Sequence, residues 1–272
     1  MCKLGWSCAG FTALLVLSSA PPLRAQWVRY PTAGMPRKAD GTPNLAAPAP
    51  KKDGKPDLSG IWAAEKNRPC PPAGCDDMEI GQEFLNIGWS LKGGLPYQPW
   101  AADLVKTRTA RHGQDDPGSH CLPTGIVMMH TTPLLKKIVQ LPGLIAILNE
   151  RNTAYRQIFT DGRPLENDPQ PTWNGYSTGK WVGNTLVVES NGFREGVWLD
   201  RGGSPLTEAG KITERFRRVN FGRMEIELTV NDPKAYRSSW TIKLNQNLVP
   251  DTELLDYVCL ENEKDMQHLT GK

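Results

Sequence analysis

Short runs in which apolar and polar residues alternate dominate the chain after residue 136. The clearest example spans residues 172–193, where two runs of strand-forming residues flank Gly183-Asn184, a pair suited to a tight two-residue turn. With that turn, Trp181 lies opposite Leu186 on one face of the sheet. The stretch therefore predicts a β-hairpin with one apolar face directed toward a core.

The same alternation recurs at hairpin spacing along the rest of the chain. Consecutive hairpins favour up-and-down order, and closure removes exposed strand edges. We therefore predict an all-β fold, an antiparallel lipocalin-like barrel of about eight strands. Gly60-x-Trp62 is similar to the pattern in the first strand of lipocalins. Besides residues 61–62 and the central hairpin, the predicted strands are 137–141, 144–149, 154–160, 211–219, 223–230, 239–244 and 253–259.

Two helices are predicted before the main run of strands. Residues 79–91 carry apolar side chains at roughly helical spacing. Residues 99–111 have a proline in the first turn and are followed shortly by Gly113. We expect these helices, within an insertion at 78–112, to pack over one side or one mouth of the barrel.

The N-terminal part of the chain divides into two segments. Residues 1–25 have the pattern of a secretory signal peptide, with a short apolar run and a cleavage site before Gln26. That run is shorter than the roughly 20 residues that a membrane-spanning helix needs. The proline-rich residues 26–56 are predicted to be irregular, ahead of a single barrel domain at 57–272. We expect a soluble monomer, periplasmic or secreted.

Four cysteines remain once a signal peptide is removed: Cys70, Cys75, Cys121 and Cys259. An even number in an exported protein favours disulfides over free thiols. Cys70 and Cys75 close a small loop and form a natural local pair, which leaves Cys121 to pair with Cys259. A metal site built from all four is the alternative, but the CxxC spacing typical of such sites is missing.

A third hairpin puts a carboxylate on an apolar face. Residues 211–219 and 223–230 flank a three-residue turn, and the register sets Arg217 opposite Glu225 on the polar side. On the other side, Glu214 falls between two apolar neighbours of its own strand. The sequence therefore predicts that Glu214 is directed toward the core.

A buried carboxylate has two interpretations. Its pKa rises if it is unpaired, which suits general acid–base catalysis, and Glu189 with Glu214 would be the two carboxylates of a glycosidase. Alternatively, Glu214 forms a buried salt bridge to Arg156 or Arg163, and we favour this interpretation. Arg163 follows an Asp-Gly turn signal, so it is also a candidate for holding an anion at the barrel mouth.

Motifs for metal binding or nucleophilic catalysis are missing. The histidines form no HxH or HExxH pair, and no G-x-S-x-G occurs. His120 and His130 flank the Cys121 loop and are candidates for a two-histidine site, and His130 is the candidate haem ligand. We expect no cofactor and no metal.

The chain resembles a broad family of secreted, largely uncharacterised proteins from acidobacteria and proteobacteria. The resemblance spans roughly residues 56–268 and implies export without assigning an activity. Family members are expected to carry histidine where Leu206 stands, so a base or ligand at that position would be lacking here. Besides the central hairpin, the matching segments are 96–101, 160–163, 198–201, 212–215, 232–236, 257–259 and 261–263.

Composition narrows the function classes. The net charge is +3 and no dense basic stripe occurs, so a nucleic-acid partner is not expected. Our first hypothesis is binding of a small, partly apolar or aromatic ligand inside the barrel. A hydrolase or isomerase using Glu214 and Arg163 is the second hypothesis, and a structural module of the cell envelope with a filled core is the third. The candidate ligand-binding residues are Trp62, Arg163, Trp173, Trp181, Glu214 and Trp240.

Overall fold

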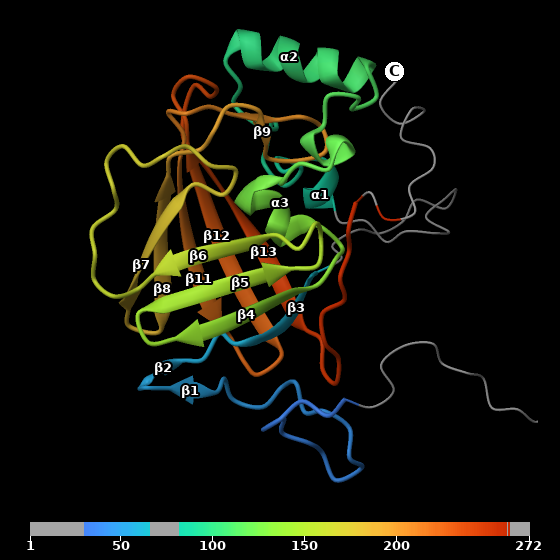
Figure 1. Cartoon of the computed structure of the whole chain (residues 1–272), viewed down its shortest axis with the longest axis vertical. Helices are drawn as coiled ribbons and strands as arrows, with labels where there is room; N and C mark the ends of the chain where they lie inside the picture. Colours follow the sequence, from blue (N-terminus) through green and yellow to red (C-terminus); the bar gives the residue numbers. More distant parts are fainter. Residues whose placement is uncertain (1–29, 66–81, 260, 262–272) are drawn as a thin grey trace, which may run out of the picture.

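The computed structural model describes residues 30–65, 82–259 and 261 (Figure 1). Nine strands form a closed barrel in the order β11-β12-β13-β3-β4-β5-β6-β7-β8, and β8 pairs back onto β11. The predicted all-β barrel is therefore confirmed, with nine strands rather than about eight. The strands are β3 (Gly60–Ala64), β4 (Lys136–Leu141), β5 (Leu144–Asn149), β6 (Tyr155–Phe159), β7 (Tyr176–Val182), β8 (Thr185–Asn191), β11 (Lys211–Arg218), β12 (Arg223–Asn231) and β13 (Trp240–Leu248).

The expectation that all strands are antiparallel is wrong at one junction, because β6 and β7 run parallel. A parallel neighbour requires a connection that returns the chain to the end at which the first strand began. Residues 160–175 make this connection, whereas every other neighbouring pair of barrel strands is antiparallel.

The predicted hairpin registers are confirmed. In the central hairpin Trp181 pairs with Leu186. In the third hairpin Arg217 pairs with Glu225, and the two side chains form an ion pair on the outer surface. The same register directs Glu214 inward, where it is fully buried.

Inward-facing side chains fill the barrel. Because successive residues of a strand point to opposite faces, buried and more exposed positions alternate along β11, β12 and β13. Most of the interior is therefore apolar. The core includes Trp62, Ile126, Ile138, Ile147, Ile158, Leu186, Val188, Ile212, Phe216, Met224, Ile226, Leu228, Ile242 and Leu244.

Helices gather at one end of the barrel (Figure 1). The predicted helix at 99–111 is confirmed as α2 (Pro99–Ala110). Where the structure describes the predicted helix at 79–91, only α1 (Gln82–Leu85) is helical, and turns follow it. A short 3-10 helix (Pro117–His120) and α3 (Gly125–Thr131) were not predicted. Every residue of α3 is buried, and α3 closes the end of the barrel beneath α2.

The remaining short strands lie outside the barrel. The predicted strand at 253–259 is wrong: this segment is irregular apart from one bridge between Tyr257 and Arg151. Two pairs of two-residue strands are formed by β1 (Lys51–Lys52) with β2 (Lys55–Pro56) and by β9 (Val197–Trp198) with β10 (Pro205–Leu206).

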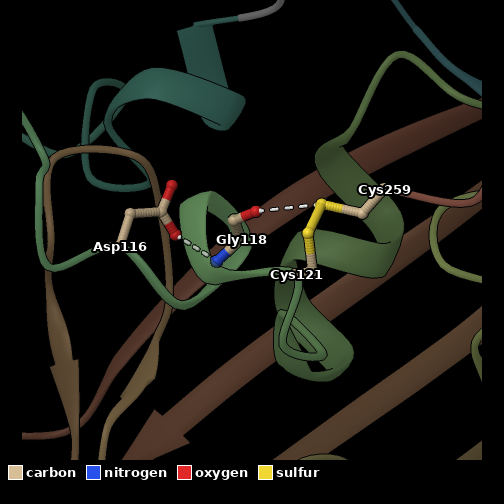
Figure 2. The surroundings of a disulfide bond; sticks show 4 residues. All are labelled: Asp116, Gly118, Cys121 and Cys259. Carbon is tan, nitrogen blue, oxygen red and sulfur yellow. Dashed lines mark hydrogen bonds between the residues drawn. A yellow bond between two sulfur atoms is a disulfide. The ribbon is translucent and has the colours of Figure 1, made fainter. Parts of the chain in front are cut away.

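A disulfide joins Cys121 to Cys259, as predicted (Figure 2). Figure 2 shows the bond beside Gly118, whose N–H donates to Asp116 (2.8 Å). The bond fastens the C-terminal segment to the loop that precedes α3. The predicted Cys70–Cys75 pair and the predicted signal peptide lie outside the described residues.

Candidate functional site

The weakest junction of the barrel lies between β6 and β7, and we call it the seam. Its ladder contains one residue pair, Phe159 with Thr178. Beyond that pair, the Asn174 side chain bridges the two segments by donating to the Tyr155 carbonyl oxygen (2.8 Å). Gly175 leads into β7 with φ +63°, and a Cβ on it would lie 2.5 Å from the Asn191 carbonyl oxygen. Only glycine fits there, so Gly175 allows the start of β7 to lie close against the end of β8.

Arg156 crosses the seam from inside the barrel. Its guanidinium donates to Ser177 on β7 (3.3 and 3.2 Å) and to Ser190 on β8 (3.0 Å). It also forms a bidentate ion pair with Glu214 on β11, with one contact of 3.0 Å. One buried side chain from β6 therefore links three further strands. We call Arg156, Ser177, Ser190, Glu214 and His130 the buried network.

Glu214 is ionised within the buried network. Burial alone would raise its pKa, but the Arg156 guanidinium and a hydrogen bond from His130 outweigh burial and hold the pKa at about 2. His130 Nε2 lies 2.8 Å from Glu214 Oε1. Because an ionised carboxylate only accepts, Nε2 carries the proton. Burial lowers the pKa of His130, so the ring is neutral and Nδ1 has no partner among the described residues.

Glu214 forms a buried salt bridge with Arg156, which is the interpretation that we favoured from the sequence. A carboxylate with a pKa of about 2 is a poor proton donor near neutral pH, and Glu214 lines none of the cavities described below. Arg163 does not join it, because the turn after β6 places Arg163 outside the barrel, paired with Asp161 (2.6 Å). Glu189 is exposed, since it neighbours the inward-facing Ser190 on the same strand. The two carboxylates therefore point to opposite faces of the sheet.

A cavity of about 420 Å³ opens at the seam, and we call it the seam cavity. Its aromatic lining comes from β6, β7 and the segment before β7. Arg156 and Ser177 contribute the link to the buried network. The full lining comprises Pro123, Asn152, Thr153, Ala154, Tyr155, Arg156, Gln157, Phe159, Thr172, Trp173, Asn174, Gly175, Tyr176 and Ser177.

Of the four predicted tryptophans, only Trp173 lines the seam cavity. Trp62 is fully buried in the core and donates to the Leu58 carbonyl oxygen (3.1 Å). Trp240 is also buried, and Trp181 packs against the outside of the core cluster. Sequence composition marks strand tryptophans as core or wall residues, but it does not show which one borders a gap between strands.

Arginines cover two of the aromatic rings of the seam cavity. The Arg194 guanidinium lies 4.9 Å from the centroid of the Trp173 ring, and that of Arg163 lies 4.0 Å from the centroid of Phe159. Cation–π contacts of this length restrict ring orientation. The aromatic lining is therefore held in place from the outside.

A second, smaller cavity of about 10 Å³ adjoins the seam cavity, and we call it the inner chamber. Pro123, Asn152, Ala154 and Asn174 belong to both linings, so the two spaces adjoin along these four residues. The remaining lining residues of the inner chamber are Thr124, Gly125, Met129, Thr132, Asn149 and Arg151.

Lys136 was not predicted from the sequence. It is fully buried on β4, directly opposite Asn149, and Nζ has no partner among the described residues. Burial lowers the pKa of Lys136 to about 7. The signal was present, because Lys136 shares the inward face of β4 with Ile138 and Gln140.

The other predicted polar residues do not line the seam cavity. His120 bonds at the surface to the Gln114 carbonyl oxygen (2.8 Å), whereas His130 lies within the buried network. Leu206, where the family resemblance leads one to expect histidine, is buried. Within residues 30–65, 82–259 and 261, no group of three or more metal-binding side chains is placed to hold an ion.

Asp200 orders the long connection between β8 and β11. Its carboxylate accepts from the Ile87 N–H (2.8 Å) and from the N–H (3.0 Å) and hydroxyl (2.8 Å) of Ser204. Burial raises the pKa of Asp200. With its oxygens occupied by the backbone and Ser204, this carboxylate holds a loop together.

Comparisons with known proteins give no family for the chain. No family model and no curated protein matches it. A solved structure titled "REP1-NXSQ fatty acid transporter" is similar over 71% of this chain and 96% of that chain, with 15% sequence identity and a TM-score of 0.31. A score of that size does not establish a shared fold. Among the described helices, none is long and apolar enough to cross a membrane.

Proposed function

We propose that this protein binds a small, partly aromatic molecule in the seam cavity. The observation that carries the proposal is a cavity of about 420 Å³ lined by four aromatic side chains, Tyr155, Phe159, Trp173 and Tyr176. Binding sites for small molecules have volumes of about 300–1,000 Å³ and are lined mainly by apolar and aromatic residues with a few polar groups. The seam cavity meets that description.

Because the barrel interior is filled by core side chains, the proposed binding site lies in the barrel wall rather than on the barrel axis. Our sequence hypothesis placed it inside the barrel, with Trp62, Trp173, Trp181 and Trp240 as candidate wall residues. Trp62 and Trp240 pack in the core instead. The wall is open only where strands separate, and the seam is the junction with the shortest ladder.

Main-chain groups of β6 add polar contacts to the seam cavity. Asn149 N–H donates to the Ala154 carbonyl oxygen (2.8 Å), so Ala154 directs its main chain toward β5. Main-chain groups alternate in direction along a strand, so those of Tyr155 and Gln157 face β7. The Tyr155 carbonyl oxygen already accepts from the Asn174 side chain, so a ligand that carries polar atoms on an aromatic frame would bond to the Tyr155 N–H and to the main chain of Gln157.

Titration with 1-anilinonaphthalene-8-sulfonate, a small aromatic probe that fluoresces in apolar sites, tests the proposal. Trp173→Ala removes the largest ring of the lining and should raise the Kd of the probe about tenfold, from lost stacking and apolar contact. Trp89→Ala is the matched control, because Trp89 is exposed in a turn after α1.

Both variants must unfold cooperatively, since the probe also binds loosened proteins. If the folded Trp173→Ala protein binds the probe as tightly as the unaltered protein does, the proposal is wrong. The same conclusion follows if the two variants weaken binding equally.

A further inference from the structure

The inner chamber holds polar atoms that the protein itself leaves without partners. Thr132 is 1% exposed, and its hydroxyl has no partner among the described residues. The buried Oδ1 of Asn152 also has no partner among the described residues. Both residues line the inner chamber, and Asn152 also lines the seam cavity. An unsatisfied buried polar atom costs about 1–3 kcal/mol, so two at the end of one cavity indicate a place for a polar group.

The size of the inner chamber limits that group to one atom. About 10 Å³ is the space of a single water-sized probe. One oxygen fits, whereas a carboxylate or phosphate does not. A hydroxyl oxygen both donates and accepts, so it satisfies Thr132 and also Asn152, whichever atom of the amide faces it.

The charge of the lining favours a hydroxyl over a cationic group. Among the described residues that line the inner chamber, Arg151 is the only charged one. A guanidinium only donates hydrogen bonds, so it favours a ligand oxygen over an ammonium group. The hydroxyl would lie directly beyond the aromatic lining of the seam cavity, which suits a group attached to an aromatic ring.

We propose that the ligand is a phenol: its ring occupies the seam cavity and its hydroxyl enters the inner chamber between Thr132 and Asn152. This inference rests on the proposed function and adds the chemical class of the ligand. Asn152 is positioned for the role, because its N–H donates to the Tyr257 carbonyl oxygen (2.9 Å) in the segment that the Cys121–Cys259 disulfide fastens.

The test uses two probes of nearly equal shape, 2-naphthol and 2-methylnaphthalene, and two isosteric variants. Thr132→Val removes the hydroxyl from the inner chamber. Thr131→Val is the matched control, because the Thr131 hydroxyl is also buried and unpartnered among the described residues, but Thr131 lines a different small cavity beside His130 and Gln246. Each removes an unsatisfied hydroxyl, so both proteins should fold.

We expect Thr132→Val to raise the Kd of 2-naphthol about fivefold, the effect of one lost hydrogen bond of about 1 kcal/mol. The Kd of 2-methylnaphthalene should stay within about twofold, and Thr131→Val should change neither. If both probes bind and Thr132→Val leaves their ratio unchanged, the phenol assignment is wrong while binding in the seam cavity stands. If neither probe nor the anilinonaphthalene binds, both proposals fail.

Discussion

The two sides of the barrel are built differently. On one side, β11, β12 and β13 pair along eight residues at each junction. At the seam, β6 and β7 share a single pair. On the long-ladder side, ion pairs such as Arg217 with Glu225 lie outside, where water screens them. At the seam, the ion pair of Arg156 with Glu214 lies inside and is nearly inaccessible to solvent.

The difference shows how a barrel can open its wall without losing closure. Long ladders hold the first side through the main chain. At the seam, side chains do the same task, because Arg156 reaches from β6 to β7, β8 and β11. Closing the seam from the inside leaves its outer part free to form a cavity.

The largest effect is expected from breaking the buried ion pair. Glu214→Gln leaves the Arg156 charge buried without a counter-charge, which should lower the free energy of unfolding by about 3–5 kcal/mol. Glu225→Gln on the opposite side is the matched control and should cost about 0–1 kcal/mol. Urea unfolding of both variants at neutral pH measures the contrast, and equal losses would contradict the role given to the seam.

The pH dependence of the same pair sharpens the comparison. The pKa of Glu214 is lowered, so its stabilisation is complete above the unfolded-state pKa of about 4.3 and is lost as pH falls toward about 2. The Glu214→Gln protein should lose this part of its acid sensitivity, whereas the Glu225→Gln protein should keep it.

Replacing Lys136 is expected to raise the free energy of unfolding, whereas replacing Glu214 lowers it. Its pKa is lowered to about 7, so between pH 7 and the unfolded-state value near 10.4 the unfolded chain binds the extra proton. The free energy of unfolding should therefore rise with pH across this window, by about 4 kcal/mol. Lys136→Met should be more stable than the unaltered protein at pH 7 and should lack this rise.

The adjacent lysine provides the control for that prediction. Lys137 points outward and pairs with Glu253 (2.6 Å), so Lys137→Met should keep the alkaline rise. If Lys136→Met is less stable at pH 7 than the unaltered protein, the Lys136 ammonium stabilises the fold and the prediction is wrong.

Local patterns predicted one side of the barrel better than the other. The turns at Gly183-Asn184 and at residues 220–222 set the hairpin registers, and alternation then placed Glu214 inside. The parallel pairing of β6 with β7 depends on the long connection at 160–175, which carries no local signal for the direction of its return. The alternation of apolar and polar residues therefore could not predict the seam or its cavity.

Helix α3 was missed, and the choice between Arg156 and Arg163 as the partner of Glu214 was left open, for physical reasons. Every face of α3 is buried, so its sequence lacks the apolar periodicity that marks a helix at a surface. Arg156 and Arg163 lie near each other in sequence and both carry a charge that could pair with Glu214. Only their positions relative to the end of β6 decide that Arg156 points inside and Arg163 outside.

The most direct test of the central claim is a map of amide chemical shifts on addition of 1-anilinonaphthalene-8-sulfonate. We expect the largest changes at residues 152–159 and 172–177, together with the indole N–H of Trp173. Amides of β12 and β13 should change little. Changes centred on β12 and β13, or spread evenly over the barrel, would contradict the claim that the seam is the binding site.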